Sequence, residues 1–329
     1  MIFITVFFCQ ISLYWGSPVT QLSVLKTPVI PANMKKKIRF SVQDLCTSAG
    51  DVRSYKILPN KFVQAIGPYV FLQHIFSSKH SMNGSYKVPV GKNSHPYRGM
   101  VILTYIISGE VEHVDSIGNH ITLSSGGVHC MNTGKGIIQD EAVKAGFSSN
   151  NPDISILQFW VNLPSGRKSE KPDYFSFQSN DIPKQKLEGE AGWIKVLLGG
   201  YGNSNAQVPC YSKEFLYHIH LEAGKQFSIE THEKIDYAVF LPSNKVAIND
   251  IEFQAGKLIV FTSHGEIIEL YNGGETATDI IQFGGEHYNE PIVAEETFVM
   301  NTPHEITQAY NDFYDGKYGQ IRNLKNNNL

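Results

Sequence analysis

The chain between Ser94 and Glu141 alternates short apolar runs with glycine-containing turns. The apolar runs 101–107 and 111–115 are separated by Ser108-Gly109, and the turn Ile117-Gly118-Asn119 follows the second run. Such runs, broken every few residues by glycine and asparagine, are typical of short β-strands and not of helices. The pattern therefore predicts a β-meander in this part of the chain.

The second half of the chain repeats this rhythm. Residues 215–221, 238–241 and 257–261 read as strands separated by Gly and Asn turns. A length of 329 residues favours two domains. We expect an all-β protein with one domain at 36–165 and a second at 166–329, joined by the Pro/Lys/Ser-rich stretch 163–172.

A single helix is expected near the C-terminus. Thr302-Pro303-His304-Glu305 forms a capping box, with Thr302 as the N-cap and Pro303 at the first helical position. An apolar stripe with helical spacing follows, and its members are Ile306, Ala309, Tyr310 and Phe313. Gly316 fits a left-handed stop after the helix. We expect this helix to pack against a barrel.

Candidate ligands flank the first meander in two pairs. His95 and Tyr97 precede it, and Gln139 and Glu141 follow it. Each pair has i, i+2 spacing, which places both side chains on one face of a strand. A small barrel that brings both pairs into its mouth would form a pocket with four ligands.

The same stretch resembles the N-terminal domain of the pirin family, the two-domain members of the cupin superfamily. The residues that carry the resemblance are His95-Pro96, Arg98-Gly99, Thr104-Tyr105, Gly109-Glu110, His113, Asp115-Ser116, Gly118-Asn119, Gly134, Gly136-Ile137 and Glu141. Segments 159–164, 290–293 and 298–302 resemble the end of the family's first domain and its C-terminal signature. The match spans residues 36 to 322. It implies two tandem cupin (jelly-roll-type) β-barrels with a C-terminal helix.

The resemblance also implies a metal site in the N-terminal barrel, at His95, Tyr97, Gln139 and Glu141. The family has histidine at three of these positions and glutamate at the fourth, and two of the three histidines are replaced here by Tyr97 and Gln139. A tyrosine phenol titrates near ~10 and stays protonated. A glutamine carbonyl suits Ca²⁺ or Mg²⁺ better than iron. We therefore expect Fe(II) or another divalent metal to bind weakly or not at all.

Two neighbouring positions also differ, since Val101 replaces the family's first-motif glutamate and Cys130 stands where members often have tryptophan. One interpretation is that the pocket remains as a metal-free cavity or packed core. The other is that Tyr97 and Gln139 bind weakly, or that a nearby histidine substitutes. His129 is the candidate for that exchange.

Two functions follow from these alternatives. The first is a pirin-like bicupin with a degenerate N-terminal metal site, acting as a regulatory or small-molecule-binding protein. The second is an Fe-dependent dioxygenase for flavonol-like, quercetin-type substrates, in which Arg98 would steady an anionic intermediate. A small aromatic ligand and a protein partner are both compatible with the first, which we favour.

The second half carries no comparable site. His218 and His220 have i, i+2 spacing, and Glu230 and His232 stand where a first cupin motif would place ligands. No matching second motif follows either pair. Because the C-terminal barrel of pirin-like chains is normally metal-free, we interpret both pairs as structural.

Composition narrows the remaining possibilities. A net charge of −3 gives no electrostatic basis for nucleic-acid binding. The four cysteines are widely spaced, which argues against a disulfide framework and fits a reducing, cytoplasmic location. In residues 1–33, no Lys or Arg precedes the apolar stretch, as it would in a signal peptide. The apolar stretch is also too short to span a membrane. We expect residues 1–33 to be a disordered extension upstream of Met34, or a degenerate signal sequence.

Overall fold

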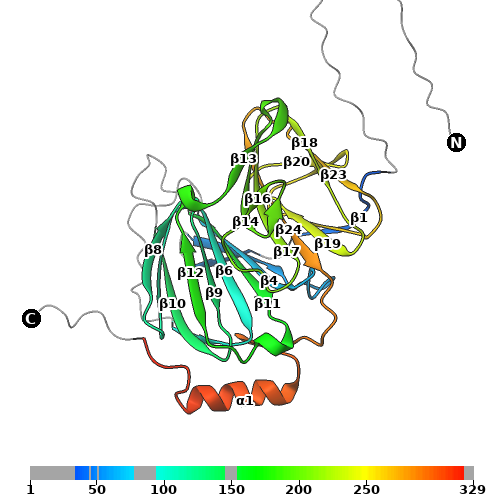
Figure 1. Cartoon of the computed structure of the whole chain (residues 1–329). Helices are drawn as coiled ribbons and strands as arrows, with labels where there is room; N and C mark the ends of the chain where they lie inside the picture. The colour runs from blue at the N-terminus through cyan, green and yellow to red at the C-terminus, as the bar shows by residue number, and fades with distance from the viewer. Residues whose placement is uncertain (1–33, 44–45, 50–51, 78–93, 145–153, 322–329) are drawn as a thin grey trace, which may run out of the picture. The chain divides into compact units, whose positions relative to one another are not determined.

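The computed structural model describes residues 34–43, 46–49, 52–77, 94–144 and 154–321, so the expectation for residues 1–33 lies outside it. These described residues form two barrels of the same kind, each built from a seven-stranded and a four-stranded antiparallel sheet (Figure 1). One α-helix follows them near the C-terminus. The expected fold of two tandem cupin barrels with a C-terminal helix is confirmed.

The N-terminal barrel pairs its strands out of sequence order, as a jelly roll does. Its seven-stranded sheet runs β12 (Asp173–Phe177), β9 (Val128–Asn132), β6 (Met100–Ser108), β11 (Ser155–Asn162), β4 (Tyr69–Ser77), β3 (Val52–Leu58) and β2 (Cys46–Ala49). Its four-stranded sheet runs β5 (His95–Tyr97), β10 (Ile137–Lys144), β7 (Glu110–Asp115) and β8 (His120–Ser124). The apolar runs expected as strands are β6 and β7, but the expected meander is wrong, because β6 and β7 lie in different sheets and only β7 and β8 of this stretch form a hairpin.

The C-terminal barrel repeats this plan. Its seven-stranded sheet runs β1 (Ile38–Val42), β22 (Leu258–Phe261), β19 (Ile235–Phe240), β24 (Thr278–Glu286), β17 (Glu214–Leu221), β14 (Gly192–Leu198) and β13 (Lys184–Lys186). Its four-stranded sheet runs β18 (Gln226–Glu230), β23 (Ile267–Tyr271), β20 (Val246–Ile248) and β21 (Ile251–Phe253). Two small hairpins are β15 (Gly200–Tyr201) with β16 (Ser204–Asn205), and β25 (Val293–Glu295) with β26 (Phe298–Met300).

Two strands, β1 and β12, belong to the barrel other than the one expected from their place in the sequence. Strand β1 pairs with β22, so the first described strand belongs to the C-terminal barrel. Strand β12 pairs with β9 and extends the N-terminal barrel beyond residue 165. The division into 36–165 and 166–329 stays a prediction, and the sheets themselves exchange these segments across it.

An apolar core joins the two barrels. Tyr69 and Phe159 from the N-terminal barrel meet Phe283 from the C-terminal barrel, with ring centroids 5.1–5.7 Å apart in edge-on contacts. The Tyr69 hydroxyl donates across the junction to the Phe215 carbonyl at 2.8 Å. Aromatic pairs of this geometry add to the stabilisation from buried area, so the barrels are packed together and not merely linked.

Helix α1 (Pro303–Tyr314) begins as the capping box predicts. Glu305 N–H donates to the Thr302 hydroxyl at 3.2 Å, and Thr302 N–H donates to the Glu305 carboxylate at 2.8 Å. The buried face of the helix includes Ile306 and Ala309, and Gly316 has the expected positive φ of 74°. The helix lies beside the strands of the N-terminal barrel in Figure 1, where Asp312 pairs with Arg98 at 2.6 Å.

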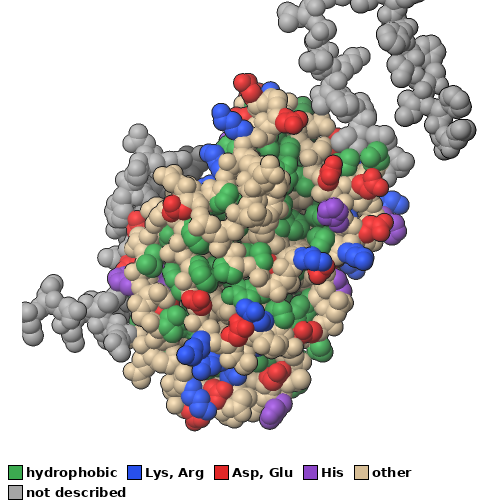
Figure 2. Space-filling model, viewed as in Figure 1, with side chains coloured by type: hydrophobic (Ala, Val, Ile, Leu, Met, Phe, Trp, Pro, Cys, Tyr) green, Lys and Arg blue, Asp and Glu red, His purple; other side chains and the backbone are tan. Residues whose placement is uncertain are grey.

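The surface shows no segregation of charge on the face drawn in Figure 2, where Lys and Arg are interspersed with Asp and Glu. Within the described residues, no helix has the length and apolarity needed to cross a membrane. The cysteines of the described part, Cys46, Cys130 and Cys210, are unpaired thiols. The expectation about nucleic acid stays a prediction.

Candidate metal centre

Strand register places three titratable side chains on one inner face of the N-terminal barrel. Strands β7 and β10 run antiparallel with His113 directly opposite Glu141. Strand β9 lies in the other sheet, where His129 is opposite Thr104 of β6. His113 and His129 have 1% and 0% of their side chains exposed, and Glu141 has 14%. The two sheets thus bring these side chains together in the barrel interior.

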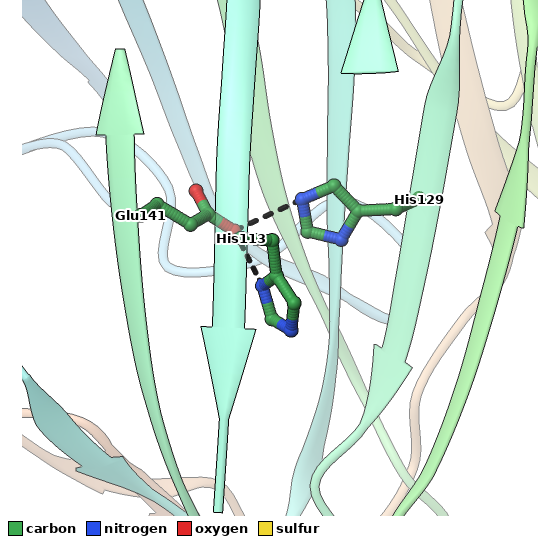
Figure 3. Close-up of side chains that lie close together, drawn as sticks. All are labelled: His113, His129 and Glu141. Carbon is green, nitrogen blue, oxygen red and sulfur yellow. Dashed lines mark ion pairs between the residues drawn. The ribbon is translucent and has the colours of Figure 1, made fainter. Parts of the chain in front are cut away.

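The two imidazoles face a single carboxylate oxygen, as Figure 3 shows. His129 Nε2 lies 3.0 Å from Glu141 Oε1, and His113 Nδ1 lies 3.7 Å from the same oxygen. Among the described His, Cys, Asp and Glu residues, this is the group of three whose ligand atoms all lie within 4.8 Å of one another. Its donors are two imidazole nitrogens and one carboxylate oxygen.

This donor set fits a divalent transition metal. Ligands that share one ion at bond lengths of about 2.0–2.2 Å lie about 3.0–3.5 Å apart, close to the spacing observed here. His113 Nδ1 and His129 Nε2 are both buried, and apart from Glu141 Oε1 neither has a hydrogen-bond partner. Buried polar nitrogens normally have partners, so two that face one carboxylate indicate a site arranged for a cation. Two histidines and one carboxylate are the ligand type of non-haem iron sites.

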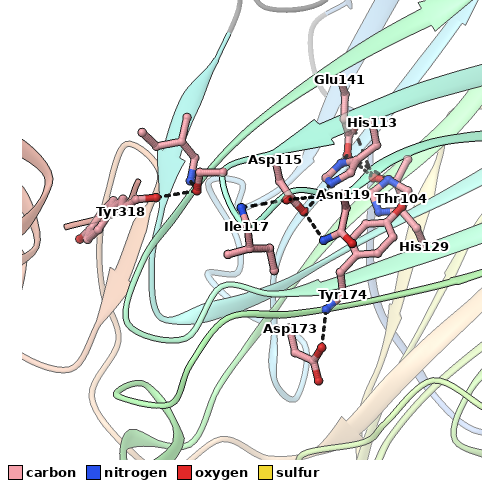
Figure 4. Close-up of polar contacts among 12 residues, drawn as sticks. Thr104, His113, Asp115, Ile117, Asn119, His129, Glu141, Asp173, Tyr174 and Tyr318 are labelled. Carbon is pink, nitrogen blue, oxygen red and sulfur yellow. Dashed lines mark hydrogen bonds and ion pairs between the residues drawn. The ribbon is translucent and has the colours of Figure 1, made fainter. Parts of the chain in front are cut away.

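Asp115 orients the first of these imidazoles (Figure 4). Its Oδ2 lies 3.1 Å from His113 Nε2, which assigns the ring proton to Nε2 and leaves the Nδ1 lone pair facing Glu141. The Asp115 carboxylate in turn accepts hydrogen bonds from the backbone N–H groups of Ile117 and Asn119 and from the Asn119 side chain, at 2.7–3.1 Å. Carboxylates placed in this way behind a histidine are typical of metal sites.

Glu141 is held on its other side by neutral donors. The Gln158 amide donates to Oε2 at 3.2 Å, and the Thr104 hydroxyl donates to Oε1 at 3.3 Å. The indole N–H of Trp160 donates to the Gln158 carbonyl oxygen at 3.3 Å and so orients that amide. The carboxylate is therefore fixed before any ligand arrives.

The protonation states also suit a cation. Burial alone would raise the pKa of the Glu141 carboxyl, but His129 and His113 outweigh it and hold that pKa well below its usual range. Burial lowers the pKa of His129 more than Glu141 raises it. Burial also lowers the pKa of His113, yet Asp115 and Glu141 together raise it above its usual value. The site thus presents an ionised carboxylate and a neutral His129 at neutral pH, whereas His113 holds its second proton more firmly and must release it when a metal binds.

Tyr174 of β12 covers both imidazoles. Its ring stacks on His113 with centroids 4.6 Å apart and on His129 with centroids 5.5 Å apart. The segment that extends the N-terminal barrel beyond residue 165 therefore supplies one wall of the centre.

The four residues expected from the sequence are distributed around this group. Glu141 is a member, and Tyr97 lies close enough for burial and the Glu141 charge to raise the pKa of its phenol to about 12. The Gln139 side chain lies near the Tyr97 phenol, and both side chains are buried. His95 pairs with Gln139 in register, but its side chain is exposed. The metal role of these four residues stays a prediction.

Arg98 does not face this group. Its guanidinium donates to Asp312 on α1 at 2.6 Å and approaches the Tyr318 hydroxyl at 3.5 Å. It therefore ties the helix to the barrel, and the expected steadying of an anionic intermediate finds no support in these contacts.

From the sequence, His129 is named only as a candidate substitute, and His113 is not indicated as a ligand. Two signals were available. His113 and Asp115 form an i, i+2 pair like the two pairs that were singled out, and His129 stands in an apolar strand. What could not be read from the sequence is that three strands from two sheets meet at one point.

The histidine pair of the second half faces away from the C-terminal barrel interior. The Tyr105 hydroxyl of the N-terminal barrel lies 2.6 Å from His218 Nδ1, and His218 Nε2 lies 3.0 Å from Asp279 Oδ1. His220 Nδ1 lies 2.7 Å from the same oxygen. These contacts agree with the structural interpretation of the pair.

Comparison with known proteins gives a consistent result. The family model described as Pirin matches residues 51–161, and the Pirin C-terminal cupin domain matches residues 216–319. A Pseudomonas aeruginosa protein named "Putative quercetin 2,3-dioxygenase PA2418" is 30% identical over 228 residues, which is 69% of this chain and 79% of that protein. A pirin-like protein of Solanum lycopersicum is 28% identical over 259 residues, 78% of this chain and 84% of that protein.

The fold has a close counterpart among solved structures. A crystal structure of quercetin 2,3-dioxygenase from Acinetobacter baumannii superposes with a TM-score of 0.76 at 27% sequence identity. The superposition covers 88% of this chain and 100% of that chain. Both barrels and the C-terminal region thus have counterparts in a single known protein.

Proposed function

Because the chain belongs to the pirin family of two-domain cupins, we propose that its N-terminal barrel binds a divalent transition metal through His113, His129 and Glu141. The observation that carries the proposal is the convergence of His113 Nδ1 and His129 Nε2 on Glu141 Oε1, at 3.7 and 3.0 Å. On this proposal the protein is a metal-binding bicupin that acts by binding a small aromatic ligand at this barrel.

The proposal revises the ligand set that the resemblance implies. Glu141 keeps its role, while His113 and His129 supply the two imidazoles that positions 97 and 139 lack. Tyr97 is a neighbour of the centre, since burial and the Glu141 charge raise the pKa of its phenol, and Gln139 lies next to Tyr97. His95 is exposed and would have to turn inward to reach the metal.

Each residue of the centre has a separate task. Asp115 keeps His113 in the tautomer that offers Nδ1, and Gln158 with Thr104 holds the Glu141 carboxylate in place. Tyr174 covers the imidazoles and limits access of water. When bound, Fe(II) or another divalent metal would supply a Lewis acid with open positions for a ligand.

A second candidate function is dioxygenase activity on flavonol-like substrates. The relatives named as quercetin 2,3-dioxygenases favour it, as does a donor set of two histidines and one carboxylate. Binding is placed first because the three donors suffice to hold a metal, whereas Arg98, the residue expected to steady an anionic intermediate in catalysis, pairs with Asp312 instead.

Metal content of single variants tests the ligand set. We expect His113→Ala and His129→Ala to bind Fe(II), Ni(II) or Co(II) more than a hundredfold more weakly than the wild type, whereas His95→Ala and the exposed control His120→Ala retain metal. Circular dichroism and thermal unfolding of each variant show that the barrel is folded. Loss of metal in His95→Ala with retention in His129→Ala would instead support the four ligands that the family resemblance implies, His95, Tyr97, Gln139 and Glu141.

Two measurements on the metal-loaded wild type separate binding from catalysis. Quercetin titration followed by tryptophan fluorescence reports binding, because Trp160 lies beside the centre. Oxygen consumption with quercetin reports turnover. Binding without oxygen uptake supports the first function, metal-dependent uptake supports the second, and neither signal would contradict both.

A further inference from the structure

The C-terminal segment after the last strand contacts the ends of β5, β7 and β10, and the last two of these strands carry His113 and Glu141 of the metal centre. The segment comprises α1 and the turn through Tyr318. Asp312 on the helix pairs with Arg98, the residue after Tyr97 at the end of β5. The Tyr318 ring lies against Gly136 at the start of β10, where a Cβ would come within 2.1 Å of that ring. The segment is therefore seated on the strand ends of the four-stranded sheet.

Ser116 makes the most direct connection, because it is next to Asp115. Its hydroxyl donates to the Tyr318 carbonyl oxygen at 2.5 Å and accepts from the Ile138 N–H at 3.1 Å. One side chain thus joins the C-terminal segment, the β7–β8 turn and strand β10. Each of its two hydrogen bonds is made by a partner in a different element.

The β7–β8 turn is joined to β10 and to the C-terminal segment at Ser116, whose backbone N–H also donates to the Ile138 carbonyl at 2.8 Å. A cleft of about 290 Å³ lies between the turn and Gln320–Ile321, so the two segments are not continuously packed there. The turn holds Asp115 through the N–H groups of Ile117 and Asn119. Movement of the turn would therefore move the Asp115 carboxylate.

Asp115 connects the β7–β8 turn to the metal centre, because its carboxylate contacts both the turn and His113. Its Oδ2 holds His113 Nε2–H, and His113 Nδ1 faces Glu141. Figure 4 shows Tyr318, Asp115, His113 and Glu141 in this order from the C-terminal segment to the centre. Tyr318 contacts Ser116, the neighbouring Asp115 at the end of β7 contacts His113, and His113 faces Glu141.

We propose that the C-terminal segment is a positioning element for the metal centre, acting through Ser116 and Asp115 to fix the orientation and tautomer of His113. The proposal rests on the proposed metal role of His113 and names what regulates that site. A change that shifts α1 or Tyr318 would weaken metal binding without touching a ligand. Asp115 and Ser116 are positioning residues and contact no metal.

The first test uses the metal-free full chain, so its outcome does not depend on the proposed function. Ring ¹⁵N signals of His113, assigned by their absence in His113→Ala, report its tautomer. At a pH high enough to leave the His113 ring neutral, we expect a single Nε2–H tautomer in the wild type, in Ser116→Thr and in Ser124→Ala, an exposed serine of the same hairpin. In Ser116→Ala the two nitrogen shifts should move towards each other. Unchanged His113 signals in Ser116→Ala would overturn the proposal.

The second test measures Ni(II) affinity by competition with a chelator. We expect roughly tenfold weaker binding in Ser116→Ala, the lower end for outer-shell changes at metal sites, and recovery in Ser116→Thr. Asp312→Ala, which releases α1 from Arg98, acts less directly and should weaken binding by less than about tenfold, below the range for direct outer-shell partners. An altered tautomer with wild-type affinity would overturn the positioning role. A wild type that binds no Ni(II) would contradict the proposed function, while the His113 signals still decide the first test.

Discussion

The N-terminal and C-terminal barrels are built from the same two sheets but are filled differently. In the C-terminal barrel, Ile229 pairs with Ile268 and Ile248 pairs with Leu270, all at most 5% exposed. In the N-terminal barrel, the corresponding kind of strand pair places His113 opposite Glu141. The C-terminal barrel therefore folds without a histidine–carboxylate group at this place, although it buries the neutral amide of Gln282.

This difference gives the polar group its significance. Burying a carboxylate and two imidazoles costs free energy that an apolar core does not incur. The C-terminal barrel shows that the same architecture is available without that cost. The side chains at 113, 129 and 141 are thus better explained by binding than by stability, which is the reasoning behind the proposed centre.

The largest effect on stability is expected when a carboxylate is placed in the interior of the C-terminal barrel. We expect Ile268→Glu to destabilise the protein by more than about 4 kcal/mol, because no partner faces it. The matched change Glu141→Leu should cost only about 1–3 kcal/mol, since it leaves imidazoles without an acceptor. Urea unfolding of both variants measures the difference, and equal losses would contradict the distinction between the barrels.

Metal should stabilise one barrel only. At a free metal concentration of 1,000 times Kd, binding is expected to add about 4 kcal/mol to the free energy of unfolding. Hydrogen exchange should slow in β7, β9 and β10 and stay unchanged in β18 and β23. A chelator should reverse the effect, and His113→Ala should show none. Protection of the C-terminal barrel instead would place the metal elsewhere.

Acid should weaken the junction between the barrels. His74 is 2% exposed and packs edge-on against Phe240 of the other barrel, and burial lowers its pKa to about 3. The unfolded chain takes up this proton near pH ~6.5, so stability is complete above that pH and is lost as the pH falls towards 3. The loss is about 1.4 kcal/mol per pH unit.

The variant His74→Leu isolates this contribution. Between pH 6.5 and 4.5 it should lose less stability than the wild type, by roughly 2.7 kcal/mol. His120→Leu, at an exposed histidine, should follow the wild type. Chemical unfolding across this pH range provides the measurement, and identical slopes for the wild type and His74→Leu would show that His74 is not the group responsible.

The smallest effect is expected at the helix that packs on the N-terminal barrel. Thr302→Ala removes the N-cap and should cost about 1 kcal/mol, with faster hydrogen exchange confined to α1. Thr307→Ala in the middle of the helix should be neutral or slightly stabilising. Faster exchange in the C-terminal barrel of Thr302→Ala would contradict the assignment of the helix to the N-terminal barrel.

Much of the fold could be predicted from local pattern. Alternating apolar runs gave β6, β7 and the strands of the second half, and the capping box gave the start of α1 at Pro303. These features depend on residues close in sequence, which is why they are legible there. The exchange of β1 and β12 between the barrels could not be seen, because it depends on pairing with distant strands.

The candidate centre divides in the same way. Strand parity in the sequence is enough to put Gln139 and Glu141 on one face, and the resemblance to the pirin family drew attention to Glu141. By itself, the sequence determined the fold class, the helix and the carboxylate. Only the tertiary structure decided which imidazoles meet that carboxylate, because His113 and His129 come from strands of two different sheets whose separation is set by packing across the barrel.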